Sequence, residues 1–342
     1  FEPKLHQIIP EYEMEDRIVL KKVDWERMVY RHDGKEYPLL DQNFPTIDPK
    51  NPLALTQAEE ELMTVIEASF LHSEPLKRHI DFLYSHGSTY LCVNNNLLFH
   101  GCIPMEEDGS FSELEMEGEK FSGKSLMDDI AVKMVCAYYG DEEDEDVLPA
   151  RDFMWYLWCG PKSPMFGKSK MATFENYFVE DKAIRKEIYN PYYQLCNHEE
   201  ICDKIFREFG MDPELSHIVN GHVPVKIKDG ETPVKASGKL FVIDGGISKA
   251  YQPKTGINGY TLIFNSHHLA LAEHRNFSQI ENDMGAYTPK LQVVEVMPRR
   301  LKISDTDNGR HLQERIHDLE KLLEAYETGT IKENRRSVYH IY

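Results

Sequence analysis

The chain has 342 residues, of which 41% are hydrophobic and 28% charged, so it can bury one large or two smaller cores as a globular protein does. Its formal net charge of −19 argues against a nucleic acid or an anionic membrane as a partner. No apolar run reaches the length of a membrane span, no signal peptide is visible, and the six cysteines lack the CxxC spacing. We therefore expect a cytoplasmic protein with reduced thiols.

The N-terminal part predicts two hairpins separated by two helices. Residues 17–40 alternate apolar and polar side chains on either side of an Asp-Gly turn, which predicts a β-hairpin. A capping-box pattern begins a helix over 56–70, and a second capped helix follows over 73–87. Residues 88–100 predict another hairpin, with an Asn-rich turn in its middle.

The middle of the chain is predicted to be mostly helical. Residues 106–123 are polar and acidic and predict a loop, whereas 124–139 and 149–158 keep the helical spacing of apolar side chains. A loop rich in Gly, Pro and Lys covers 159–170, and mixed helical segments continue to Gly210.

Strands are predicted to dominate from Ile218 to about Ile303, before one last helix. The mixture of helices and strands, without internal repeats, predicts an α/β fold. The last helix is amphipathic, because apolar residues recur along it at helical spacing: Leu312, Ile316, Leu319, Leu323 and Tyr326.

Two histidines stand at the ends of apolar strands in matching sequence contexts. One apolar run leads to His100 and a glycine, and another, over 217–220, leads to a glycine and His222. Because α/β sheets hold their ligand sites at the carboxyl ends of strands, these histidines suggest a metal site. Asp244 ends a third apolar strand and would belong to the same rim, that is, the edge of the sheet at which these strands end. The alternative is that these residues only mark ordinary places where strands pass into loops.

Three literal motif matches have more ordinary explanations. Residues 118–125 fit the Walker A pattern, but no buried strand precedes them, which favours a serine near a helix start. Residues 140–144 resemble half of a GDxxDRG metal motif without the arginine and glycine, as expected of a solvated acidic loop. Residues 197–199 resemble GNHE without its glycine, and Asn197 is predicted to cap a helix over 199–209.

Basic side chains gather in two glycine-containing loops near the suspected rim. In so acidic a protein, local clusters of cations suggest recognition of phosphate, although lysines in loops are as often simply solvated. The candidate substrate-binding residues are Lys162, Lys168, Lys170, Lys249, Tyr251 and Lys254.

The sequences LLFHGCIP around His100 and NGHVPVK around His222 resemble the last two metal-binding motifs of calcineurin-like metallophosphoesterases. Three longer stretches resemble one branch of that superfamily, the class III fructose-1,6-bisphosphatases found in Firmicutes. They are WYLWCGPKSPMFGK (155–168), VIDGGISKAYQ (242–252) and TGINGYTL (255–262). The similarity runs along essentially the whole chain.

The resemblance implies a phosphatase that hydrolyses the 1-phosphate of fructose 1,6-bisphosphate to fructose 6-phosphate and phosphate, a step of gluconeogenesis. It implies two divalent metal ions, expected to be manganese, that activate a hydroxide. His100 and His222 would be catalytic metal ligands, and Asp244 would orient a ligand imidazole. The lysines and the tyrosine named above would bind the substrate.

One part of the family pattern does not precede His100. The Asp-x-His, GDxxDRG and GNHE motifs of the family come before its first His-Gly, and this chain begins with Phe1 and has none of them upstream. The chain is therefore expected to be the C-terminal portion of such an enzyme, inactive alone, with the N-terminal portion on the same or a separate chain. A homo-oligomer is also expected. The alternative is a non-catalytic binding or regulatory module that keeps the metallophosphoesterase fold.

The resemblance also implies a domain organisation: part of a metallophosphoesterase β-sandwich flanked by helices, with mostly helical accessory segments. An accessory hairpin and helices would cover 1–87 and core strands 88–105. A largely helical insertion would cover 106–210 and the C-terminal core strands 211–304. A C-terminal helix and tail would cover 305–342.

Overall fold

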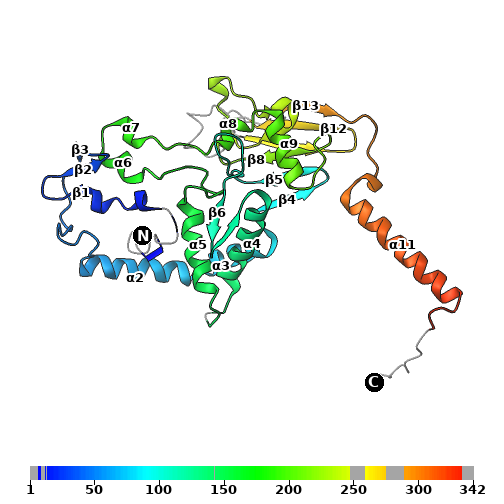
Figure 1. The fold of residues 1–342 in the computed structure, drawn as a ribbon, viewed down its shortest axis with the longest axis horizontal. Coiled ribbons are helices and arrows are strands. Elements are labelled where there is room, and N and C mark those ends of the chain that lie inside the picture. The colour runs from blue at the N-terminus through cyan, green and yellow to red at the C-terminus, as the bar shows by residue number, and fades with distance from the viewer. Residues whose placement is uncertain are drawn as a thin grey trace, which may run out of the picture. The chain divides into compact units, whose positions relative to one another are not determined.

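The computed structural model of the protein describes residues 7–8, 12, 14–141, 143–246, 259–274 and 289–332, and it has a mixed α/β fold (Figure 1). The chain divides into two compact units. The first comprises residues 1–91, 96–225 and 231–244, and the second comprises 92–95, 226–230 and 245–342. No helix in the described ranges is long and apolar enough to cross a membrane.

The first unit begins with a three-stranded antiparallel sheet of β1 (Val23–Asp24), β2 (Val29–His32) and β3 (Lys35–Pro38). The predicted Asp-Gly turn joins β2 to β3, and both of its residues have positive φ, as this type of tight turn requires. The prediction of one strand from Arg17 to Arg31 was wrong, because 3-10 turns at Glu15–Arg17 and Leu20–Lys22 come first and a turn over 25–28 then separates β1 from β2.

Helices α2 (Gln57–Leu71) and α3 (Glu74–His86) follow, each with its predicted cap. The Thr56 hydroxyl accepts from the backbone N–H of Glu59, whose carboxylate in turn accepts from the Thr56 N–H, so the capping box is complete. Neither helix has a buried residue, although both carry apolar side chains.

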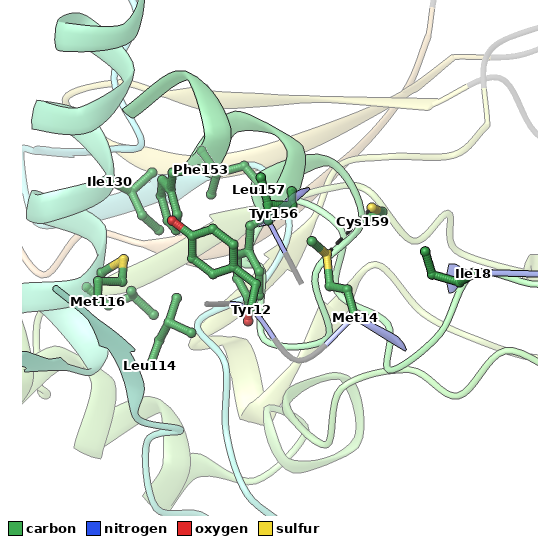
Figure 2. Packing of buried hydrophobic residues seen from close by; sticks show 12 residues of the cluster. Tyr12, Met14, Ile18, Leu114, Met116, Ile130, Phe153, Tyr156, Leu157 and Cys159 are labelled. Atoms are coloured by element: carbon green, nitrogen blue, oxygen red, sulfur yellow. Dashed lines mark hydrogen bonds between the residues drawn. The ribbon is translucent and has the colours of Figure 1, made fainter. Parts of the chain in front are cut away.

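Helices α4 (Gly123–Tyr139) and α5 (Val147–Cys159) confirm the two predicted helices of the middle region. The segment before them is not a simple loop as predicted, because β6 (Leu114–Met116) and β7 (Glu119–Phe121) form a hairpin there. Figure 2 shows the core that this hairpin closes with α4, α5 and the N-terminal segment. Its members include Tyr12, Leu114, Met116, Ile130, Phe153 and Tyr156.

The Walker-like residues 118–125 span the turn of this hairpin and the start of α4. Their serines make the reciprocal cap that the sequence favoured, since Ser122 and Ser125 close a capping box at the helix start. The carboxylate of Glu208 also accepts from the backbone N–H of Lys124 at 3.0 Å. A side chain of the protein itself thus occupies the place where a phosphate would have to lie.

Four shorter helices lead to the central sheet: α6 (Thr173–Phe178), α7 (Lys182–Arg185), α8 (Tyr192–Leu195) and α9 (Glu199–Glu208). The predicted Asn197 cap of α9 is wrong. The N-cap residue is His198, and the Asn197 side-chain amide donates backwards to the carbonyls of Tyr193 and Gln194.

The central sheet has the strand order β4-β5-β8-β10-β9. Its strands are β4 (Tyr90–Val93), β5 (Asn96–Phe99), β8 (His217–Asn220), β9 (Val234–Lys235) and β10 (Leu240–Val242). Strands β5, β8 and β10 are parallel, and Leu97, Ile218 and Leu240 lie side by side across them. These three side chains are fully buried, which fixes the register of the strands.

The second unit contains the antiparallel sheet β11-β12-β13 and the long helix α11 (Asp307–Glu327). Its strands are β11 (Gly259–Phe264), β12 (His268–His274) and β13 (Lys290–Val296). The backbone N–H groups of Asn94 and Asp307 each donate to the other residue's side chain, which ties the first turn of α11 to a β-turn. The α/β class is thus confirmed, while the metallophosphoesterase sandwich and the predicted domain boundaries stay predictions.

Candidate metal centre

The two histidines singled out from the sequence meet at one edge of the central sheet. His100 directly follows β5, and His222 comes two residues after β8. Because β5 and β8 are adjacent and parallel, their carboxyl ends lie at the same edge. The two imidazoles are consequently in contact, with His100 Nε2 3.1 Å from His222 Nδ1 and ring centroids 5.0 Å apart.

Glycines allow the chain to turn sharply beside both histidines. A Cβ atom at Gly101 would lie 2.2 Å from the carbonyl oxygen of Pro164, so only glycine fits there without displacing backbone. The Gly221 N–H donates to the carbonyl of His100 at 3.0 Å, which joins the two strand exits. His222 itself has a φ of +67°, an unfavourable conformation for a residue with a Cβ atom and one that is frequent at functional sites.

A backbone carbonyl orients the His222 ring. His222 Nε2 lies 3.1 Å from the carbonyl oxygen of Phe166, which can only accept, so Nε2 carries the proton in the neutral ring and Nδ1 keeps its lone pair. Ser163 supports this arrangement, since its buried hydroxyl accepts from the backbone N–H of Phe166 and donates to the carbonyl of Leu157. Metal-binding histidines are commonly held in this way by a carbonyl on the far side of the ring.

The surroundings keep His222 neutral. Burial lowers the pKa of its imidazole, and the neighbouring His100 and the charge of Lys168 lower it further. The Phe166 carbonyl and, more weakly, Asp244 act in the opposite direction. A neutral imidazole with a free lone pair is the form that binds a metal ion.

The pair fits part of a metal's coordination shell. Metal–imidazole bonds are about 2.1 Å long, and twice that length exceeds the 3.1 Å between the two nitrogens, so both can reach one ion. Within the described ranges, no group of three or more His, Cys, Asp and Glu side chains assembles as a complete site. The two imidazoles therefore suit a divalent transition metal, and they leave most of its ligand positions to other groups.

The histidine pair lies in a cleft of about 570 Å³ above the strand ends. Asp244, the third predicted rim residue, lines the same cleft, and its carbonyl accepts from the backbone N–H of Val225. The structure thus brings together the three strand-end residues that the sequence singled out. The other lining residues come from α3, β4 and the strand ends and include His86, Ser88, Tyr90 and Asn220.

Asn220 is a residue of the cleft that the sequence did not single out. Its side chain is buried at the end of β8 and donates to the hydroxyl of Tyr192 at 2.9 Å and to the carbonyl of Gly101 at 3.3 Å. It therefore links β8 to the residue after His100. The signal was present in the sequence as an amide that ends an apolar strand, since a buried amide needs specific partners.

The candidate lysines separate in the structure. Lys168 pairs with Glu187 at 2.5 Å, lies over the rings of Phe166 and Tyr189, and is close enough to His222 to lower its pKa. Lys162 donates to the carbonyl of Glu113, and Lys170 donates to the carbonyl of Ile184. The remaining candidates lie outside the described residues: Lys249, Tyr251 and Lys254.

Comparison with known proteins agrees with the resemblance seen in the sequence. The family model for Firmicute fructose-1,6-bisphosphatase matches residues 1–328. The chain is 54% identical over 334 residues to the class 3 fructose-1,6-bisphosphatase of Finegoldia magna, an alignment that covers 97% of this chain and 51% of the relative. The corresponding enzyme of Fusobacterium nucleatum is 51% identical over 328 residues, with 95% of this chain and 51% of the relative covered.

The chain spans about half the length of the curated relatives it matches. The class 3 fructose-1,6-bisphosphatase of Bacteroides fragilis repeats this relation, with 49% identity over 95% of this chain and 49% of the relative. No solved structure was found to match.

Proposed function

Because the chain belongs to the Firmicute fructose-1,6-bisphosphatase family, we propose that it forms part of a metal-dependent sugar-bisphosphate phosphatase. The proposed reaction releases the 1-phosphate of fructose 1,6-bisphosphate and yields fructose 6-phosphate and phosphate. In this proposal, His100 and His222 bind one ion of a divalent pair, with manganese as the expected metal. The remaining ligands come from the part of the family sequence that this chain does not cover, on the same or a separate polypeptide.

The observation that carries this proposal is the contact between His100 and His222 at the ends of adjacent parallel strands. The facing nitrogens are 3.1 Å apart, and the far nitrogen of His222 bonds to the Phe166 carbonyl. A contact between ordinary core histidines would not need one ring held by a backbone carbonyl on its far side, nor a strained backbone at that histidine. Both features are expected of ligands.

A divalent metal bound there would lower the pKa of a coordinated water and would offset the negative charge of phosphoryl oxygens. The protein's own residues have more limited roles. The Phe166 carbonyl holds the proton of His222 on Nε2, and Gly101 and Gly221 allow the strand exits to approach each other. In this proposal Lys168, which is held by its ion pair with Glu187 close enough to His222 to lower its pKa, helps to attract a phosphate.

Metal binding by the isolated chain is the first test. We expect isothermal titration with Mn²⁺ or Zn²⁺ to give weak binding, and His100→Ala or His222→Ala to weaken it at least about tenfold, because half of the imidazole donor set is lost. His72→Ala is the matched control, since that histidine lies exposed at the C-cap of α2 with its Nδ1 bonded to the Ala68 carbonyl. Equal affinities of the wild type and both pair variants would contradict the assignment.

Phosphate release is the second test. The chain would be combined with the N-terminal half of a relative such as the F. magna enzyme, and phosphate release from fructose 1,6-bisphosphate would be followed with Mn²⁺. We expect activity in the combination, little in either part, and a loss of at least about a hundredfold with His222→Ala. If the combined parts bind each other and the metal but release no phosphate, the alternative of a binding or regulatory module is favoured.

A further inference from the structure

Helix α11 presents an apolar stripe that nothing in the described part of the chain covers. Gly309 is its only buried residue, and the other 20 of its 21 residues are exposed or partly exposed. Along one face, five large apolar side chains are between 44% and 62% exposed: Leu312, Ile316, Leu319, Leu323 and Tyr326. A solvent-exposed stripe of this size usually marks a surface that binds another chain.

The spacing of this stripe is that of a coiled coil. The five residues are separated by alternating steps of four and three, so they occupy successive d and a positions of a heptad repeat. Ile316 at an a position with Leu319 at the next d position is the combination that favours two parallel strands. Lys321 lies on the far side of the helix from this stripe, at an f position.

We propose that α11 pairs with the same helix of a second copy of this chain, as a short parallel two-stranded coiled coil. The two copies align in register, so that each apolar residue of the stripe meets its own counterpart. The inference rests on the surface of α11 and is independent of the chemistry proposed for the cleft.

Charge complementarity selects the second copy, and the parallel orientation, as the occupant. In a parallel pair, a g residue faces the e residue five positions later in the partner, so Arg315 faces Glu320 of the partner subunit. The two-fold symmetry repeats this ion pair on the other side of the seam. The neighbouring g and e positions, Asn308 and Gln313, bring two neutral amides together.

An antiparallel pair of the same helices would lose these contacts. There the a residues face d residues of the partner, so Arg315 would lie opposite Leu322 of the partner subunit and Tyr326 opposite Gly309 of the partner subunit. No opposite charges would meet, and the largest side chain of the stripe would have no apolar counterpart. The parallel arrangement therefore has the greater complementarity.

Sedimentation equilibrium of the 342-residue chain over a wide concentration range tests the dimer. We expect a reversible monomer–dimer equilibrium, and monomer at every concentration for Leu319→Glu, because a charge would enter the centre of the seam. Leu319 is exposed in the monomer, so the variant should keep its circular dichroism spectrum and thermal unfolding. A wild-type chain that stays monomeric near millimolar concentration would overturn the proposal, and so would a dimer that Leu319→Glu leaves intact.

A charge-swap cycle tests the orientation. Arg315→Glu and Glu320→Arg should each raise the dimer dissociation constant about tenfold, because each places like charges opposite one another twice. The double variant should restore the wild-type value. Lys321→Glu, which makes the same change of charge as Arg315→Glu outside the seam, is the matched control and should have no such effect. Failure of the double variant to recover would overturn the parallel arrangement.

Discussion

Helices α5 and α2 of the first unit carry similar apolar residues, but α5 buries them and α2 leaves them exposed. Helix α5 buries six of its 13 residues, and Phe153 and Tyr156 stand at the centre of a core with α4 and the β6–β7 hairpin. Helix α2 has as regular a start and a complete capping box, yet it buries none of its 15 residues. Its exposed apolar residues are Leu62, Met63, Val65, Ile66, Phe70 and Leu71.

The difference shows that a capped, amphipathic sequence is enough to specify a helix but not its partner. Helical spacing of apolar residues is a local property that both helices have, and α2 has a complete capping box as well, whereas no side chain caps the start of α5. Burial depends on which other segments arrive at the apolar face, and for α5 these come from up to 145 residues away in the chain, as the contact between Met14 and Cys159 illustrates. The stability of α5 should therefore depend on its core packing, and that of α2 on its local contacts such as the cap.

The largest expected effect is the removal of a buried ring from α5. Phe153→Ala should lower the free energy of unfolding by about 3–5 kcal/mol, because the fully buried ring leaves a cavity between α4 and α5. Phe70→Ala on α2 is the matched control, since the same ring is 64% exposed there and its loss should change stability by no more than about 0.5 kcal/mol. Denaturant unfolding measures both free energies, and equal losses would contradict the difference in burial between α5 and α2.

A smaller effect is expected from the cap of α2. Thr56→Ala removes the hydroxyl that accepts from the Glu59 N–H, which should destabilise the helix by about 1 kcal/mol. Because α2 buries none of its residues, the loss should appear as faster amide hydrogen exchange within α2, with exchange in α5 unchanged. Slowed or unaltered exchange in α2 would mean that other contacts hold this helix.

The smallest expected effect concerns a carboxylate on α4, the helix that packs with α5 in the core. Burial raises the pKa of Asp129 on α4 more than the charge of Lys133 lowers it, since the Lys133 ammonium is 4.0 Å from an Asp129 oxygen that has no hydrogen-bond partner. A carboxyl whose pKa is raised by folding favours the folded state at low pH and loses that contribution as the pH rises through the folded-state pKa. Asp129→Asn should therefore stabilise the protein at pH 7 by about 0.5 kcal/mol, and the difference should shrink below about pH 4. A stability difference between the wild type and Asp129→Asn that is independent of pH would contradict the raised pKa of Asp129.

Local signals in the sequence predicted most of the elements. The Asp-Gly hairpin, both capping patterns and the helices α4, α5 and α11 follow from residues within a few positions of one another. The β6–β7 hairpin was missed because its strands are three residues long and its turn is Glu117-Gly118, which lacks the usual Asn or Asp. Such short strands carry too little alternation to be distinguished from a loop.

The metal-centre candidates could be predicted only in part, for a related reason. His100 and His222 were found because each ends an apolar strand, and the adjacency of parallel strands then brings them together. The Phe166 carbonyl that orients His222 is 56 residues away in the chain and belongs to the backbone, so no side-chain pattern reports it. The lysines were harder still, because their partners, such as Glu187 for Lys168, depend on how loops fold onto one another.

The left-handed backbone at His222 means that protein stability and the proposed metal binding favour different residues at this one position. Glycine or asparagine would relieve the strain there, and histidine is the residue with an imidazole to offer. In a laboratory lineage selected for folding alone, this position should drift toward glycine or asparagine while Ile218 and Leu240 stay apolar. In a lineage selected for growth that requires the proposed phosphatase activity, histidine should persist despite its cost. The residue found at position 222 would then show whether a lineage had been selected for folding alone or for activity as well.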